Sequence, residues 1–133
     1  MHYAIAYVST ATDLERSEVE NILEKSEKNN NKNDLTGILL FSEGNFFQII
    51  EGEKEKILEL YQKIKDDERH HNLIQIFGKD IHKESYDGYE AAFVSEGACF
   101  DSEKFHEYLK HLQVLDKPSQ LAVKNMLKAF VIQ

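Results

Sequence analysis

The chain has 133 residues, and its 41% content of hydrophobic residues is enough to build one domain with a substantial core. It carries 24 acidic and 16 basic residues, a net charge of −8. Such a surface repels phosphate backbones and anionic lipids, so neither nucleic acid nor a membrane is an expected partner. There is no apolar run long enough to span a bilayer or to form a signal peptide, and the single cysteine suits a reducing compartment, so we expect a cytoplasmic protein.

The chain begins with a strand pattern followed by a helix pattern. Residues 2–9, HYAIAYVS, predict a strand in which Ile5 and Tyr7 share one face. We expect the next helix to be capped by Ser17, because Ser17 and Glu20 have the spacing of a capping box. The asparagine-rich segment KNNNKND is expected to end this helix.

The middle of the chain predicts four strands and a second helix. Strand patterns at residues 35–42 and 45–52 flank EGN, which is typical of a tight hairpin. An amphipathic helix is expected over about 54–67, and further strands over 72–81 and 88–95. The order βαββαββ predicts an α+β fold of ferredoxin-like type, a five-stranded mixed sheet with two helices on one face.

The last third of the chain predicts two amphipathic helices, at residues 102–113 and 118–130, separated by the only proline. Their apolar stripes need a surface to cover, which the free face of the sheet or a second subunit would provide. We therefore expect a domain at residues 1–97 and a C-terminal two-helix cap at residues 98–133, the latter serving as cap, output element or oligomer contact.

A glutamine lies inside an otherwise apolar strand, GNFFQIIEG. Phe46, Gln48 and Ile50 share one face of an extended chain, and the two bulky neighbours predict that this face meets the core. A buried amide without a partner costs roughly 1–3 kcal/mol. Gln48 should therefore have a hydrogen-bond partner inside the protein.

The sequence contains no glycine-rich phosphate loop and no nucleophile elbow, and none of its six histidines pairs at the i, i+4 spacing of metal ligands on a helix. We therefore expect neither an enzyme nor a metal site. The segment KDDERHH, residues 65–71, places three consecutive acids at the end of a helix, where they oppose the helix macrodipole. This unfavourable placement suggests a functional role; the alternative is that Arg69 and His70 simply neutralise the acids.

Four segments together resemble the BLUF family of flavin-binding blue-light sensors. They are Tyr7-x-Ser9, Asn29-Asn30 followed by LTGILL, the strand GNFFQIIEG, and DDERHH. Their order and spacing match over about residues 2–95.

The resemblance implies a blue-light photoreceptor that binds FAD non-covalently. Tyr7 would donate an electron and then a proton through Gln48, whose amide would rotate or tautomerise and so change the hydrogen bond to the flavin. The resemblance also implies a set of further cofactor-binding residues: Ile22, Asn29, Asn30, Ile64, Asp67, Arg69 and His70. Output would pass to an unidentified downstream protein or through a change of a homo-oligomer, a dimer or larger.

The chain departs from the family pattern near its last strand. Many members carry Trp and Met where this chain has Tyr89 and Ala91. The departure concerns signal transmission and dark recovery, and it leaves the Tyr7–Gln48 pair intact. Two interpretations of Tyr89 stay open: a phenol near the flavin pocket, or a surface residue of the strand.

Two alternative functions also stay open. A hydrolase resembling acylphosphatases would need an arginine in a phosphate-binding loop beside the first strand, and Arg16 comes late for that role. A protein-interaction module with the same fold would bind no flavin. The colour of the purified protein distinguishes both alternatives from the photoreceptor.

Overall fold

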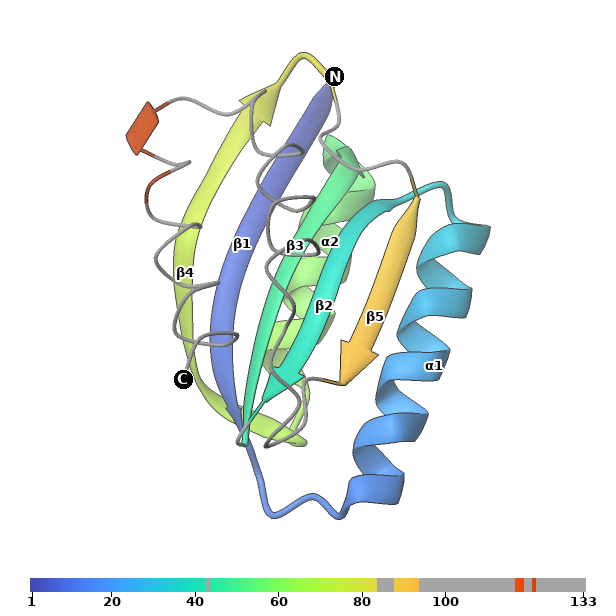
Figure 1. Ribbon diagram of the computed structural model, residues 1–133. Helices are drawn as coiled ribbons and strands as arrows, with labels where there is room; N and C mark the ends of the chain where they lie inside the picture. The colour runs from blue at the N-terminus through green and yellow to red at the C-terminus, as the bar shows by residue number, and fades with distance from the viewer. Residues whose placement is uncertain (43, 84–87, 94–116, 119–120, 122–133) are drawn as a thin grey trace.

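The computed structural model describes residues 1–42, 44–83, 88–93, 117–118 and 121. Nearly all of the predicted C-terminal cap lies outside the described residues. The described elements, in chain order, are β1 (His2–Ala11), α1 (Arg16–Lys32), β2 (Thr36–Ser42), β3 (Asn45–Glu53), α2 (Lys54–Asp66), β4 (His70–Ile81) and β5 (Tyr89–Phe93) (Figure 1). Among the described residues, no helix combines the length and the apolar character needed to cross a membrane.

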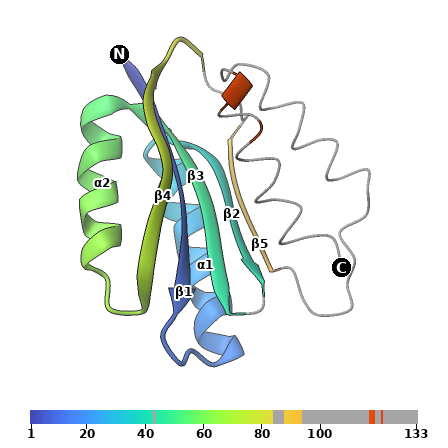
Figure 2. The ribbon, with the colours of Figure 1, turned by 90° about the vertical axis from the view of Figure 1, so that its left-hand side faces the viewer.

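The strands form one sheet in the order β4-β1-β3-β2-β5. Neighbouring strands run antiparallel, except that β5 joins β2 in parallel. Helices α1 and α2 pack on the same face of this sheet, which Figures 1 and 2 show from two directions. The structure thus confirms the predicted α+β class with two helices against a sheet.

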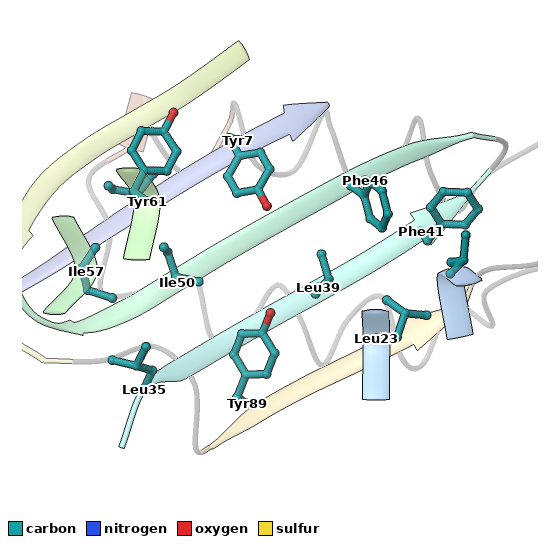
Figure 3. Packing of buried hydrophobic residues seen from close by; sticks show 12 residues of the cluster. Tyr7, Leu23, Leu35, Leu39, Phe41, Phe46, Ile50, Ile57, Tyr61 and Tyr89 are labelled. Carbon is teal, nitrogen blue, oxygen red and sulfur yellow. The ribbon is translucent and has the colours of Figure 1, made fainter. Parts of the chain in front are cut away.

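The main core lies between the two helices and the sheet. Val19 and Leu23 of α1, one turn apart, and Ile57 and Tyr61 of α2, also one turn apart, turn towards it because residues four positions apart share a helix face. Alternate residues of the strands pack against these helix residues from the sheet, and Figure 3 shows this packing. The central strand residues of this core are Ile5, Leu39, Phe46 and Ile50.

The opposite face of the sheet is also buried. Its side chains, all at most 1% exposed, are Ala4, Ala6, Ile38, Leu40, Phe47, Ile49 and Glu51. With both faces covered, the central strands carry near-continuous apolar runs, such as ILLF and FFQII, instead of a clean alternation.

The structure corrects both predicted ends of the first helix. Glu15, rather than Ser17, is the N-cap residue, and its backbone N–H donates to Glu18 Oε1 at 3.2 Å. The predicted capping box was wrong because the same three-residue spacing occurs two positions earlier. The helix also continues through the asparagines to Lys32. Tertiary contacts of Asn30, buried at 6% exposure, outweigh the weak helix propensity of asparagine.

Candidate functional site

A cavity of about 290 Å³, partly open to solvent, is formed by α1, α2, the sheet and the start of β4. Its size lies near the lower end of small-molecule pockets, roughly 300–1,000 Å³. Each residue that the sequence selected lines it: Tyr7, Ile22, Asn29, Asn30, Gln48, Ile64, Asp67, Arg69 and His70. The structure therefore brings the whole selected set to one place, although its members come from five elements and a loop.

Gln48 lies at the centre of β3, opposite Tyr7 on β1 and Leu39 on β2. Its side chain is only 4% exposed. The amide Nε2 donates to the Tyr7 phenol oxygen at 2.5 Å, and Oε1 accepts a hydrogen bond from the Tyr89 hydroxyl. The amide predicted to need a partner is thus held between two phenols.

Tyr7 is a buried phenol surrounded by aromatic rings. Its ring centroid lies 5.9 Å from that of Tyr61 and 6.2 Å from that of His70. Burial raises the pKa of Tyr7 well above its ordinary value; the hydrogen bond with Gln48 opposes this rise, and the nearby Tyr61 and Asp67 add to it. Tyr7 therefore keeps its proton throughout the neutral range.

Tyr89 is a residue of the core, not of the strand surface. Its side chain is 4% exposed, and its hydroxyl points into the same space as that of Tyr7 (Figure 3). Burial raises the pKa of Tyr89 well above its ordinary value, Tyr7 adds to the rise, and a hydrogen bond with Asn30 opposes it. Of the two interpretations left open by the sequence, the structure shows a buried phenol, hydrogen-bonded to Gln48.

The last turns of α1 bring two asparagines to the cavity. Asn30 is buried, while Asn29 is exposed at the rim. An amide offers both a donor group and an acceptor. Asn30 and Gln48 thus supply both kinds of group at the buried end of the cavity.

The segment after α2 is tied together by an ion pair. The Asp67 carboxylate accepts from the backbone N–H of Arg69 at 2.9 Å and from its guanidinium at 2.5–3.0 Å. The hydrogen bonds from Arg69 lower the pKa of Asp67 and outweigh the effect of its partial burial. Pairing with Arg69 thus offsets the charge of Asp67, whereas Asp66, the last residue of α2, still opposes the helix macrodipole.

His70 is fixed by both ring nitrogens. Nε2 lies 2.6 Å from the carbonyl oxygen of Ile64, which can only accept, so Nε2 carries the proton. In the neutral ring, Nδ1 then accepts from the Ser9 hydroxyl at 2.7 Å. This bridge joins the end of α2 to β1 at the edge of the cavity.

Sequence reasoning missed two lysines of the cavity. Lys25 of α1 and Lys63 of α2 line it together with Arg69. Lysines on the exposed side of an amphipathic helix are normally taken as solvated. The sequence pattern that could have identified Lys25 was its position one turn before Asn29, which places both residues on the same helix face.

The lining fits a planar, largely apolar ring with polar edges and an anionic tail. Ile22 and Ile64 contribute apolar surface from the two helices, and Asn30 and Gln48 contribute hydrogen-bonding groups at the buried end. The exposed lysines and Arg69 contribute positive charge. A flavin with a phosphate-bearing side chain has this chemistry.

Residues 2–92 match the family model of BLUF, described as sensors of blue-light using FAD. The blue light- and temperature-regulated antirepressor BluF of Escherichia coli (strain K12) is 36% identical over 58 residues, 44% of this chain and 14% of its own length. Subunit beta of the photoactivated adenylate cyclase of Euglena longa is 31% identical over 83 residues, 62% of this chain and 10% of its own. The structure of a bacterial light-regulated adenylyl cyclase aligns with a TM-score of 0.69 at 27% identity, covering 97% of this chain and 34% of that one. The chain thus spans a minor part of each of these proteins.

Proposed function

Because the chain belongs to the BLUF family of blue-light sensors, we propose that it is a photoreceptor that holds FAD non-covalently in the cavity and switches through Tyr7 and Gln48. The observation that carries this proposal is the Gln48 amide, which is buried in the cavity wall and hydrogen-bonded to the Tyr7 phenol. A buried amide between phenols has two exchangeable orientations, which is what a reversible switch requires.

The proposed binding mode follows the chemistry of the lining. Asn30 and Gln48 bind the polar edge of the flavin ring, and Ile22 and Ile64 pack against the ring from the two helices. The remaining selected residues, Asn29, Asp67, Arg69 and His70, lie along the rim and the loop after α2 and hold the side chain of the cofactor. Arg69 keeps N–H groups beyond those that bind Asp67 for a charge-assisted bond to phosphate.

When bound, the flavin supplies absorption of blue light and an excited state that accepts an electron. Tyr7 gives up one electron and then its phenol proton, and both return to Tyr7 when the charges recombine. The lasting change belongs to Gln48, whose amide stays rotated or tautomerised and offers its other end to its neighbours. A neutral, hydrogen-bonded Tyr7, whose pKa is raised by burial, suits this role because the phenol retains the proton that it must donate.

The first prediction tests flavin binding. The purified protein incubated with FAD should become yellow with one flavin per chain, and blue light should shift its absorption reversibly to the red. Asn30→Ala should weaken FAD binding by roughly tenfold, because it removes a buried amide from the cavity. Asn33→Ala is the matched control, since Asn33 bonds the backbone of α1 at Asn29 and does not line the cavity. A protein that stays colourless in excess FAD contradicts the proposal.

The second prediction tests where the phosphates lie. Lys25→Ala and Lys63→Ala should each weaken FAD and FMN binding by roughly two- to fivefold and leave riboflavin binding unchanged, since exposed charges contribute modestly. The effect should fade at high salt. Lys28→Ala removes a charge from the same helix outside the cavity and serves as the control. Equal losses for riboflavin and FMN would show that these lysines do not contact phosphate.

The structure favours this function over the two alternatives. Arg16 begins α1, is 65% exposed and pairs with Glu20 at 3.0 Å, so it does not form a phosphate-binding loop at the cavity. An interaction module without flavin has no use for an open cavity with a buried amide pair, Asn30 and Gln48, in its wall.

We also propose that residues 98–133 form the cap and output segment of the domain at residues 1–97. The support is the second face of the sheet, whose apolar side chains are buried, together with the two amphipathic patterns of this segment. Curated relatives named as an antirepressor and as an adenylate cyclase subunit support an effector protein as the partner. A homo-oligomer contact through the same segment is the second proposed route.

A further inference from the structure

The outer edge of β5 is bonded to helix α1 in place of a further strand. Strand β5 is an edge strand, with β2 on its inner side. Its outward backbone groups at Tyr89 and Ala91 would otherwise be exposed for pairing with another chain. Side chains of α1 bind three of these groups instead, the N–H and the carbonyl oxygen of Tyr89 and the N–H of Ala91.

Asn31 makes the closer of these contacts. Its Nδ2 donates to the carbonyl oxygen of Tyr89 at 2.9 Å, and its Oδ1 accepts from the backbone N–H of Tyr89 at 2.9 Å. Glu27, one turn earlier, accepts from the Ala91 N–H at 3.2 Å. The same Asn31 Nδ2 also donates to the Glu27 carbonyl oxygen at 2.9 Å, which holds the side chain in place. Asn31 thus fixes the backbone of one residue of β5 at two points.

That residue carries the phenol that contacts the switch. The Tyr89 hydroxyl donates to Gln48 Oε1, while Gln48 Nε2 donates to Tyr7. With the Tyr89 hydroxyl donating to Oε1 and the Tyr7 oxygen accepting from Nε2, the amide lies in one of its two orientations, and the other orientation requires both phenols to exchange these roles. The orientation therefore depends on where the Tyr89 hydroxyl lies, and this in turn depends on the backbone that Asn31 binds.

We propose that Asn31, an exposed residue outside the cavity, is a positioning residue for the photoactive amide: it fixes Tyr89, and Tyr89 fixes the dark orientation of Gln48. The proposal rests on the proposed function, because it concerns the dark state of the Gln48 switch. Asn31 thus sets the dark state of the Gln48 switch without contacting a ligand, unlike its neighbour Asn30. It also gives a rearrangement of Gln48 a physical route to the outer surface of α1.

The experiment is a double-mutant cycle read out by light. Tyr89→Phe removes the hydroxyl donor to Oε1 and should leave a red shift that recovers more slowly in the dark, by roughly three- to tenfold, the effect of one neutral hydrogen bond. Asn31→Ala should slow recovery in the same direction and should move the dark absorption band towards that of the lit state. In the Tyr89→Phe background, Asn31→Ala should change recovery by less than about twofold, because the hydroxyl through which it acts is gone.

Two control variants separate positioning from loss of stability. Asn33→Ala removes a side chain that bonds the same helix at Asn29 but does not reach β5. Tyr61→Phe removes a phenol of the same core, whose ring contacts Tyr7. Both should recover at the unmodified rate. An unchanged or faster recovery in Asn31→Ala, or an equal effect of Asn31→Ala with and without the Tyr89 hydroxyl, would overturn the proposal.

A measurement without light keeps this test separate from that of the proposed function. In the flavin-free protein, the Tyr89 amide proton should exchange with solvent at least roughly tenfold faster in Asn31→Ala than in the unmodified chain or Asn33→Ala. The Gln48 side-chain amide should give one pair of NMR signals in the unmodified protein and a second set in Asn31→Ala and Tyr89→Phe. A protein that binds no flavin but shows these changes refutes the proposed function alone. Unchanged exchange and a single pair of signals refute the positioning role of Asn31.

Discussion

Gln48→Leu and Tyr7→Phe should each retain bound flavin and lose the light-induced red shift completely. Leucine preserves most of the side-chain volume but has no amide to rearrange, and phenylalanine preserves the ring but has no phenol proton. Most of the cavity lining is unaltered in both variants, so binding should persist. The measurement is the visible spectrum of the reconstituted protein before and after blue light.

Two further expected results test the roles assigned to Tyr7 and Gln48. Tyr61→Phe should shift normally, because the Tyr61 ring lies 5.9 Å from that of Tyr7 but its hydroxyl is not one of the two phenols bonded to Gln48. Gln48→Leu should also destabilise the protein by about 1–3 kcal/mol, because the buried Tyr89 hydroxyl loses its acceptor. A full reversible shift in either Gln48→Leu or Tyr7→Phe would refute the roles assigned to these residues.

Gly37→Ala should prevent stable folding. Gly37 has φ +139°, a backbone conformation that residues other than glycine rarely adopt. An added Cβ would lie 2.0 Å from the carbonyl oxygen of Ile49. Neither neighbouring strand can move away without breaking the sheet, so we expect a loss of about 4 kcal/mol or more. Denaturant unfolding monitored by circular dichroism measures the loss.

Gly44→Ala is the matched control for this clash. Gly44 also has a positive φ, +83°, but an added Cβ would meet nothing within 4 Å. It should cost only the conformational strain of about 1–2 kcal/mol and leave the fold intact. Equal losses in the two variants would show that the close approach of β2 to β3 at Gly37 is unimportant. The position also bears on the site, because the Gly37 N–H donates to the Gly88 carbonyl oxygen immediately before Tyr89.

Local pattern was sufficient to predict the elements of the sheet and the face of β3 that meets the core. The alternation Phe46, Gln48, Ile50 places all three on one face whatever the rest of the fold, because the side-chain period of a strand is two residues. The structure finds all three at most 5% exposed on the helix-covered side. The resemblance of the spaced motifs to those of the BLUF family then selected the residues that line the cavity.

The ends of α1 could not be read from the sequence in the same way. Two possible capping boxes overlap around Ser17 and Glu15, and local chemistry does not decide between them. The asparagines of the last turns are weak helix formers by themselves. They remain helical because Asn30 lines the cavity and Asn31 binds the backbone of β5. The strands that form the cavity wall and the edge are distant from these asparagines in sequence.

The hydrogen-bond partners of Gln48 were decided by the tertiary structure alone. The sequence requires that the buried amide of Gln48 be satisfied, but it contains six tyrosines and many other polar groups that could do so. Parallel pairing of β5 with β2, set by Gly37 opposite Tyr89, brings the second phenol to Oε1. An exposed asparagine on a helix then fixes that phenol through a strand 58 residues away. Periodicity determines which face a residue occupies, whereas contacts between distant segments exist only once the chain has folded.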